Sequence, residues 1–102
     1  MFEIKEDCLL ITLPREVDHH VAGIISKQAD YQMMDERVRQ LVFDFGQTEF
    51  MDSSGIGLLA GRNDRIAFLG GRTIIVNASP RIKQMLTFAG MDKEFLYQQT
   101  GQ

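Results

Sequence analysis

The sequence predicts an α/β fold: a mixed sheet of four or five strands that begins with an N-terminal hairpin and carries about three helices. Short β-rich segments alternate along the chain with segments whose apolar residues recur every three or four positions. Strand, helix and strand in succession imply parallel pairing through right-handed crossovers. The 102 residues have the size of one domain, so a single domain over residues 1–102 is expected.

The first half of the chain predicts a hairpin, a helix and a buried strand. Residues 2–5 alternate apolar and polar, which is typical of a half-buried strand, and a turn follows at residues 6–7. Residues 8–13 are more continuously apolar, as in a strand covered on both faces, and Pro14 ends them. Asp18 is a suitable N-cap for a helix that is expected to run to about Arg37. The apolar stripe of this helix consists of Ala22, Ile25, Ala29 and Met33.

The second half predicts two further strand–helix units. Residues 41–45 form a short apolar strand, residues 46–49 a loop, and residues 50–51 re-enter the core. A second helix of roughly fifteen residues follows Asp52, and Gly70-Gly71 ends it. Its buried side is expected to comprise Ile56, Leu59, Ala60, Asn63, Ile66 and Ala67.

A β-branched strand at residues 73–76 leads to the last predicted elements. Ser79-Pro80 has the residue types that begin a helix, and Gly90 closes it. The apolar stripe of this third helix consists of Ile82, Met85, Leu86 and Ala89. Residues 95–97 are expected to form a last short strand.

Composition excludes several classes of function. The net charge of −3 and the pI of about 5.2 argue against a basic nucleic-acid-binding face. A single cysteine, Cys8, excludes an internal disulfide and a four-cysteine zinc site. The charged N-terminus does not resemble a signal peptide, and the apolar runs are far shorter than the ~20 residues of a membrane helix. We therefore expect a reduced, soluble, cytoplasmic domain with neither nucleic acid nor membrane as a partner.

The most unusual segment is residues 50–57, where two hydroxyl groups stand at a strand-to-helix junction. Glycines follow at positions 55, 57 and 61, although each glycine inside a helix costs about 1 kcal/mol relative to alanine. The start of a helix also favours an anion. Two interpretations remain open: Asp52 or Ser53 caps the helix while the glycines relieve crowding, or one exposed serine accepts a phosphate.

Two segments resemble a known family. FMDSSGIGLLAGR, residues 50–62, resembles the central motif of the anti-sigma factor antagonists, the single-domain members of the STAS family. EVDHHVA, residues 16–22, resembles the segment before the first helix of the sporulation sigma-F antagonists. Gly70-Gly71 before a β-branched strand, and Ser79-Pro80-Arg81 at the next helix, follow in the order typical of the family. The resemblance covers nearly the whole chain and implies the STAS-type mixed sheet.

The resemblance implies a partner-switching regulator that is not an enzyme. In the family, the unphosphorylated antagonist binds an anti-sigma factor that is also a serine kinase, and so frees the sigma factor. Phosphorylation then releases the antagonist, and a serine phosphatase resets it. By position, Ser53 matches the phosphorylated serine and Asp18 matches an acidic residue that faces the kinase. No cofactor or metal is implied, since ATP is expected in the partner kinase. The residues expected at the partner interface are Asp18, Met51, Asp52, Ser54, Gly55, Ile56 and Gly57.

The sequence departs from the family pattern in two places. Pro14-Arg15 stands where relatives often have glycine, so we expect the edge of the docking surface to differ. The sequence ends at Gln102, where relatives commonly continue into another helix, so we expect different C-terminal packing.

Other functions remain as alternatives. The chain could be a STAS domain with a scaffold or stressosome-type role, or a small serine hydrolase that uses Ser53, a histidine and Asp18, although no G-x-S-x-G elbow is present. His19 and His20 with Asp18 make a poor zinc site, because adjacent helical residues point about 100° apart. The glycine spacing matches neither a dinucleotide fingerprint nor a phosphate-binding loop.

Two apolar residues, Ile24 and Tyr31, fall outside the stripe of the first helix. They are either scattered surface residues or an extension of a docking face.

Overall fold

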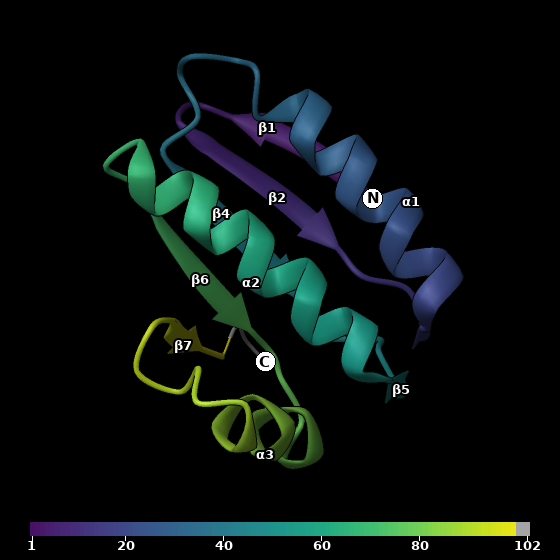
Figure 1. The fold of residues 1–102 in the computed structure, drawn as a ribbon. Helices are drawn as coiled ribbons and strands as arrows, with labels where there is room; N and C mark the ends of the chain where they lie inside the picture. The colour runs from purple at the N-terminus through teal and green to yellow at the C-terminus, as the bar shows by residue number, and fades with distance from the viewer. Residues whose placement is uncertain (100–102) are drawn as a thin grey trace.

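Five strands form one mixed sheet in which spatial order follows chain order (Figure 1). The computed structural model describes residues 1–99. The first two strands pair antiparallel and all later neighbours pair parallel, which confirms the predicted mixed sheet with an N-terminal hairpin. In spatial order the strands are β1 (Phe2–Lys5), β2 (Cys8–Thr12), β4 (Gln40–Asp44), β6 (Arg72–Val76) and β7 (Leu96–Gln98).

Three helices connect the parallel strands, as predicted. They are α1 (His19–Gln32), α2 (Ser53–Phe68) and α3 (Pro80–Phe88). α1 and α2 lie side by side over the sheet, and α3 lies beyond one end of β6 (Figure 1). Within residues 1–99, no helix is long and apolar enough to cross a membrane. The expectation about C-terminal packing at Gln102 concerns residues outside the described range.

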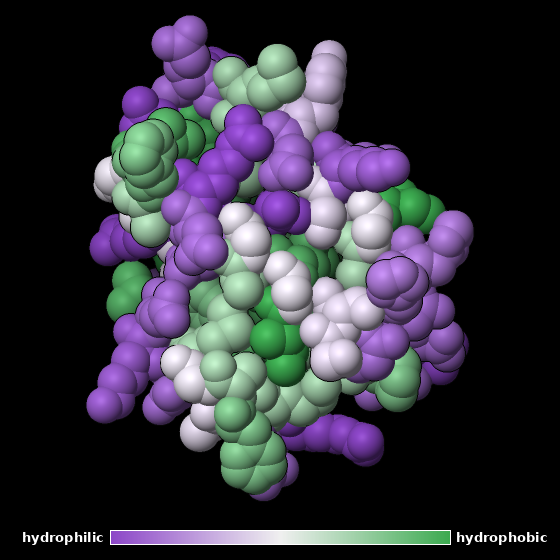
Figure 2. Space-filling model, viewed as in Figure 1, coloured by the Kyte–Doolittle hydropathy of each residue, from purple (hydrophilic) through white to green (hydrophobic). Residues whose placement is uncertain are grey.

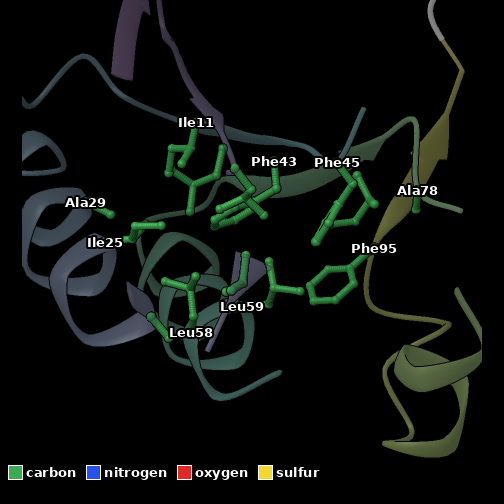
Figure 3. Packing of buried hydrophobic residues seen from close by; sticks show 14 of the residues in the cluster. Ile11, Ile25, Ala29, Phe43, Phe45, Leu58, Leu59, Ala78 and Phe95 are labelled. Carbon is green, nitrogen blue, oxygen red and sulfur yellow. The ribbon is translucent and has the colours of Figure 1, made fainter. Parts of the chain in front are cut away.

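The core lies between one face of the sheet and the helices. Leu9 and Ile11 of β2 are fully buried, whereas the alternating Leu10 is only half-buried. Figure 3 shows Ile11 and Phe43 above the side chains of the α2 residues Leu58 and Leu59. The prediction that residues 8–13 are covered on both faces is therefore wrong: every second side chain faces the helices, and the opposite face is less covered.

The first helix ends five residues earlier than predicted, at Gln32 instead of Arg37. The amide of Asp35 donates to the Gln32 carbonyl at 3.2 Å, and the Asp35 carboxylate then accepts the Arg37 amide at 2.9 Å. This tight turn lets both Met33 and Val38 enter the core. A hydrogen bond from the Arg37 side chain is the main reason why the pKa of Asp35 falls to about 2.

The buried side of α2 matches the predicted one only in part, since Ile56 and Ala60 are half-buried. Leu58 is only 3% exposed, although the prediction omitted it, and Ala67 is exposed. The buried face follows Gly55, Leu59 and Ile66, so Leu58 flanks this row and Ala67 leaves it. The predicted stripe of α3 is also too long, because Ala89 is the exposed C-cap of that helix.

An ion pair joins α1 and α2. Asp30 of α1 lies 3.0 Å from the Arg62 guanidinium of α2, measured from Oδ1 to Nε, without the alignment of a hydrogen bond. Arg65 approaches the same carboxylate oxygen at 3.8 Å. The pair therefore reinforces the packing of α1 against α2.

A second, two-stranded sheet stands apart from the first. It pairs β3 (Glu16–Val17) with β5 (Phe50–Met51) in parallel. The prediction that residues 50–51 re-enter the core holds for Met51, which is 5% exposed, but not for Phe50, which is 47% exposed. β3 was not predicted from the sequence.

The burial of α2 predicts different effects for two large apolar side chains. Leu58→Ala should lower the free energy of unfolding by about 2–5 kcal/mol, because it leaves a cavity in the core. Phe68→Ala should change it by less than about 0.5 kcal/mol, because Phe68 is 90% exposed. Urea denaturation of both variants measures these values. Equal destabilisation by the two substitutions would contradict the orientation of α2.

Candidate functional site at the start of the second helix

The pairing of β3 with β5 brings two helix starts together. Val17 lies opposite Met51 in the parallel register, and the Asp52 amide donates to the Val17 carbonyl at 3.2 Å. The carbonyl of Arg15 accepts the amides of both Glu49 and Phe50, at 2.8 and 3.0 Å. The segments that precede α1 and α2 are thus joined over several residues, so the two helices begin next to each other.

Asp18 and Asp52 occupy equivalent positions at these two helix starts. Asp18 accepts the Val21 amide at 2.9 Å, and Asp52 accepts the Ser54 amide at 2.8 Å. Their backbone torsions are almost the same, with φ near −95° and ψ of −174° in both. Each carboxylate is therefore an N-cap, which satisfies one of the free amides at the start of its helix.

The two serines of the motif have different surroundings. The Ser54 hydroxyl lies 3.2 Å from Nδ1 of His19 on α1, and the residue is half-buried. Ser53 is exposed at the first position of α2, and its hydroxyl has no hydrogen-bond partner among residues 1–99. The structure thus leaves the Ser53 hydroxyl available for modification and engages that of Ser54.

One of the motif glycines is required by packing. A Cβ atom on Gly55 would collide with the Met51 side chain and would lie 3.4 Å from Val17. A Cβ atom on Gly57 or on Gly61 would meet nothing within 4 Å. Crowding therefore explains Gly55, whereas no close contact with any described residue explains Gly57 or Gly61.

The predicted interface residues differ in how much surface they offer. Met51 and Gly55 are buried, so they support the loop from below. The space-filling view shows a pale to green surface over the first half of α2 and toward α3, bordered by hydrophilic residues (Figure 2). Gly57 is exposed, and the half-buried members of the predicted set are Asp18, Asp52, Ser54 and Ile56.

An ion pair between Arg15 and Glu49, in the segments just before β3 and β5, was not predicted from the sequence. Arg15 donates to the Glu49 carboxylate from two nitrogens, at 2.9 and 3.2 Å. This hydrogen bonding lowers the pKa of Glu49 and raises that of Arg15. Both side chains are largely exposed, so the pair orders the loop surface and adds little stability. Arg15 belongs to the Pro14-Arg15 segment that departs from the family pattern, and it is hydrogen-bonded to the loop that precedes Ser53.

The histidines do not assemble the chemistry of a hydrolase or a zinc site. His19 contacts Ser54 rather than Ser53, and the Asp18 carboxylate is engaged by a backbone amide. A triad of Ser53, a histidine and Asp18 is therefore not formed. Across residues 1–99, no group of three or more His, Cys, Asp and Glu side chains could hold a metal ion.

Comparisons with known proteins agree on one family. The STAS domain model matches residues 1–102. The anti-sigma F factor antagonist of Lysinibacillus sphaericus is 31% identical over 88 residues, which cover 86% of this chain and 75% of that protein. The unphosphorylated form of the anti-sigma factor antagonist SpoIIAA has a TM-score of 0.85 at 30% identity, covering 95% of this chain and 85% of that one. Phosphorylated Bacillus SpoIIAA gives a TM-score of 0.80 at 30% identity, with coverages of 95% and 88%.

The packing of the motif predicts opposite effects for two neighbouring glycines. Gly55→Ala should lower the free energy of unfolding by about 1–3 kcal/mol, because the new methyl group displaces Met51. Gly57→Ala should raise it by up to about 1 kcal/mol, because alanine is the better helix former and has open space. Thermal or urea unfolding distinguishes the two. A stabilising Gly55→Ala would show that Met51 does not lie beneath the helix as described.

Proposed function

The chain belongs to the STAS domain family, and from this membership we propose that it acts as an anti-sigma factor antagonist. Its relatives of about 30% sequence identity carry that description, and SpoIIAA has the same fold over nearly the whole chain. In this role the protein binds an anti-sigma factor and so frees a sigma factor in the cytoplasm. Its work is binding, and no reaction is assigned to its own residues.

The proposed switch is phosphorylation of Ser53. The unphosphorylated form binds an anti-sigma factor that is also a serine kinase, and the kinase uses ATP to phosphorylate the bound antagonist. The phosphorylated form leaves the complex, and a serine phosphatase restores the hydroxyl. ATP is held by the kinase.

The observation that carries this proposal is the contrast between the two adjacent serines. Ser53 presents an exposed hydroxyl, without a hydrogen-bond partner in the described part of the chain, at the first position of α2. Ser54 is half-buried and its hydroxyl contacts His19. A kinase that approaches this loop therefore meets the Ser53 hydroxyl first.

A phosphate on Ser53 suits the fold of this chain. It adds about 1.5–2 negative charges, and the start of a helix stabilises negative charge. Neither α1 nor α2 has an acidic side chain in its first turn, so no carboxylate of those turns opposes the added charge. SpoIIAA, whose unphosphorylated and phosphorylated forms both match this fold, supports the view that the domain survives modification.

The effect of the phosphate falls on the interface. If the partner places a carboxylate about 4 Å from Ser53, a unit like-charge pair costs about 4 kcal/mol at an effective dielectric constant of ~20. That energy corresponds to a loss of affinity of about a thousandfold. Charge at one exposed position can therefore release the partner without refolding the domain.

The proposed switch predicts which serine accepts the phosphate and how charge at that position affects binding. Tandem mass spectrometry after incubation with the cognate kinase and ATP should locate the phosphate on Ser53. Ser53→Ala should keep its affinity for the anti-sigma factor and resist release, whereas Ser53→Asp should bind weakly. Both variants should melt within a few degrees of the wild type, since Asp52 supplies the N-cap of α2 and the Ser53 side chain is exposed.

Ser54→Ala is the matched control, because it removes a hydroxyl one residue away and should still be phosphorylated and released. Equal binding of Ser53→Asp and Ser53→Ala would rule out charge at Ser53 as the switch. Phosphate found on Ser54, Ser26 or Ser79 would rule out the assignment of the acceptor. A chain that no anti-sigma kinase binds or phosphorylates would instead support a scaffold role.

A separate prediction concerns Asp18, which lies beside the Ser53 loop because β3 pairs with β5. Asp18→Asn should preserve the N-cap, since asparagine caps a helix as well as aspartate does. It should nevertheless weaken binding of the anti-sigma factor if a basic partner residue pairs with the carboxylate, and isothermal titration calorimetry measures the change. Asp64→Asn, an exposed carboxylate on α2, is the control and should have no effect. An unchanged dissociation constant for Asp18→Asn would remove Asp18 from the interface.

A further inference from the structure

Among residues 1–99, β1 is an edge strand and no strand pairs with its outer side. It lies at one end of the five-stranded order, with β2 as its neighbour. The Thr12 amide donates to the Met1 carbonyl at 2.8 Å, which makes Glu3–Leu10 and Lys5–Cys8 the next hydrogen-bonded pairs of the antiparallel ladder. The N–H and C=O groups of Phe2 and Ile4 therefore point away from β2, toward the open edge.

α1 covers the side of the sheet next to β1 (Figure 1). Two surface hollows lie between this edge and the second half of α1. One hollow of about 310 Å³ is lined by Ile4, Tyr31, Gln32, Met34 and Asp35. A second, of about 340 Å³, is lined by Phe2, Lys27, Gln28, Tyr31 and Gln32. Tyr31 is 72% exposed and Met34 is 67% exposed, so large apolar surface adjoins a strand edge that offers hydrogen bonds.

The charges of Glu3 and Lys5 favour pairing of this edge with an antiparallel second copy of β1. Glu3 and Lys5 are exposed on the opposite side of the sheet, where they share a hollow with Cys8 and Leu10. Two antiparallel copies of β1 that align Ile4 with Ile4 of the partner subunit place Glu3 opposite the partner's Lys5, and Lys5 opposite the partner's Glu3. Both pairs are non-hydrogen-bonded positions on this edge, where side chains approach most closely and opposite charges attract.

We propose that a second copy of this chain docks on β1, so that two sheets join edge to edge about a two-fold axis at Ile4. The two Ile4 residues exchange a pair of backbone hydrogen bonds, and the partner's Phe2 is directed toward the hollow formed by Ile4, Tyr31 and Met34. Each copy supplies the same surface, as a two-fold interface requires. The neighbouring register, which aligns Phe2 with the partner's Ile4, is disfavoured because it sets Glu3 against the partner's Glu3. The interface is short, so we expect a weak dimer.

Charge reversal tests this register directly. Sedimentation equilibrium of the full chain over a wide concentration range should show a monomer–dimer equilibrium that weakens at high salt. Glu3→Lys and Lys5→Glu should each raise the dimer dissociation constant by about tenfold, because both cross-strand pairs become repulsive. The double variant Glu3→Lys/Lys5→Glu should restore the wild-type constant. A mixture of the two single variants should also associate, since each then meets a complementary strand.

Asp64→Lys is the matched control, because it makes the same change of charge as Glu3→Lys at an exposed position on α2. It should leave the dissociation constant unchanged. Hydrogen exchange gives a second measurement: the Ile4 amide should become protected as concentration rises. A chain that stays monomeric at every concentration would overturn the proposal. So would a dimer that neither single reversal weakens, or one that leaves the Ile4 amide unprotected.

Discussion

Two very short strands determine where both long helices begin. β3 and β5 contribute two residues each, yet their parallel register carries the chain into equivalent N-caps at Asp18 and Asp52. The Asp52 amide donates to the Val17 carbonyl, so the hydrogen bonding between the two segments extends to the N-cap of α2. The contact between His19 and Ser54 depends on the same register. Asp52 caps α2 and Ser54 contacts α1, whereas Ser53 between them is exposed.

Local pattern was sufficient to predict most of the fold. Periodicity, apolar or β-branched runs and helix-start signals identified all three helices and the five strands of the main sheet. It failed where packing between distant segments decides the outcome. The helix α1 ends before Arg37 and Val38 enters the core beyond the turn, whereas local periodicity predicted only the burial of Met33. β3 is two residues long, too short for any alternation to be recognised.

The candidate site was predictable in its sequence position but not in its three-dimensional arrangement. The unusual glycines and the family resemblance pointed to Ser53, but only the structure separates its free hydroxyl from the engaged one of Ser54. The roles of Gly55 and Met51 were also visible only in the structure. Met51 was expected at the interface but lies buried against Gly55, under the start of α2. Arg15 and Glu49 are 34 positions apart in the chain, so their pairing left no signal in a single sequence.

The order of strands in the main sheet has a consequence for folding during synthesis on the ribosome. Because β1, β2, β4, β6 and β7 are neighbours in the order in which they occur in the chain, each new strand pairs with one already made. No strand has to insert between two that are already joined, and no earlier pairing has to open. The chain can therefore extend its sheet from one edge while synthesis continues, exposing only the latest strand as a temporary edge.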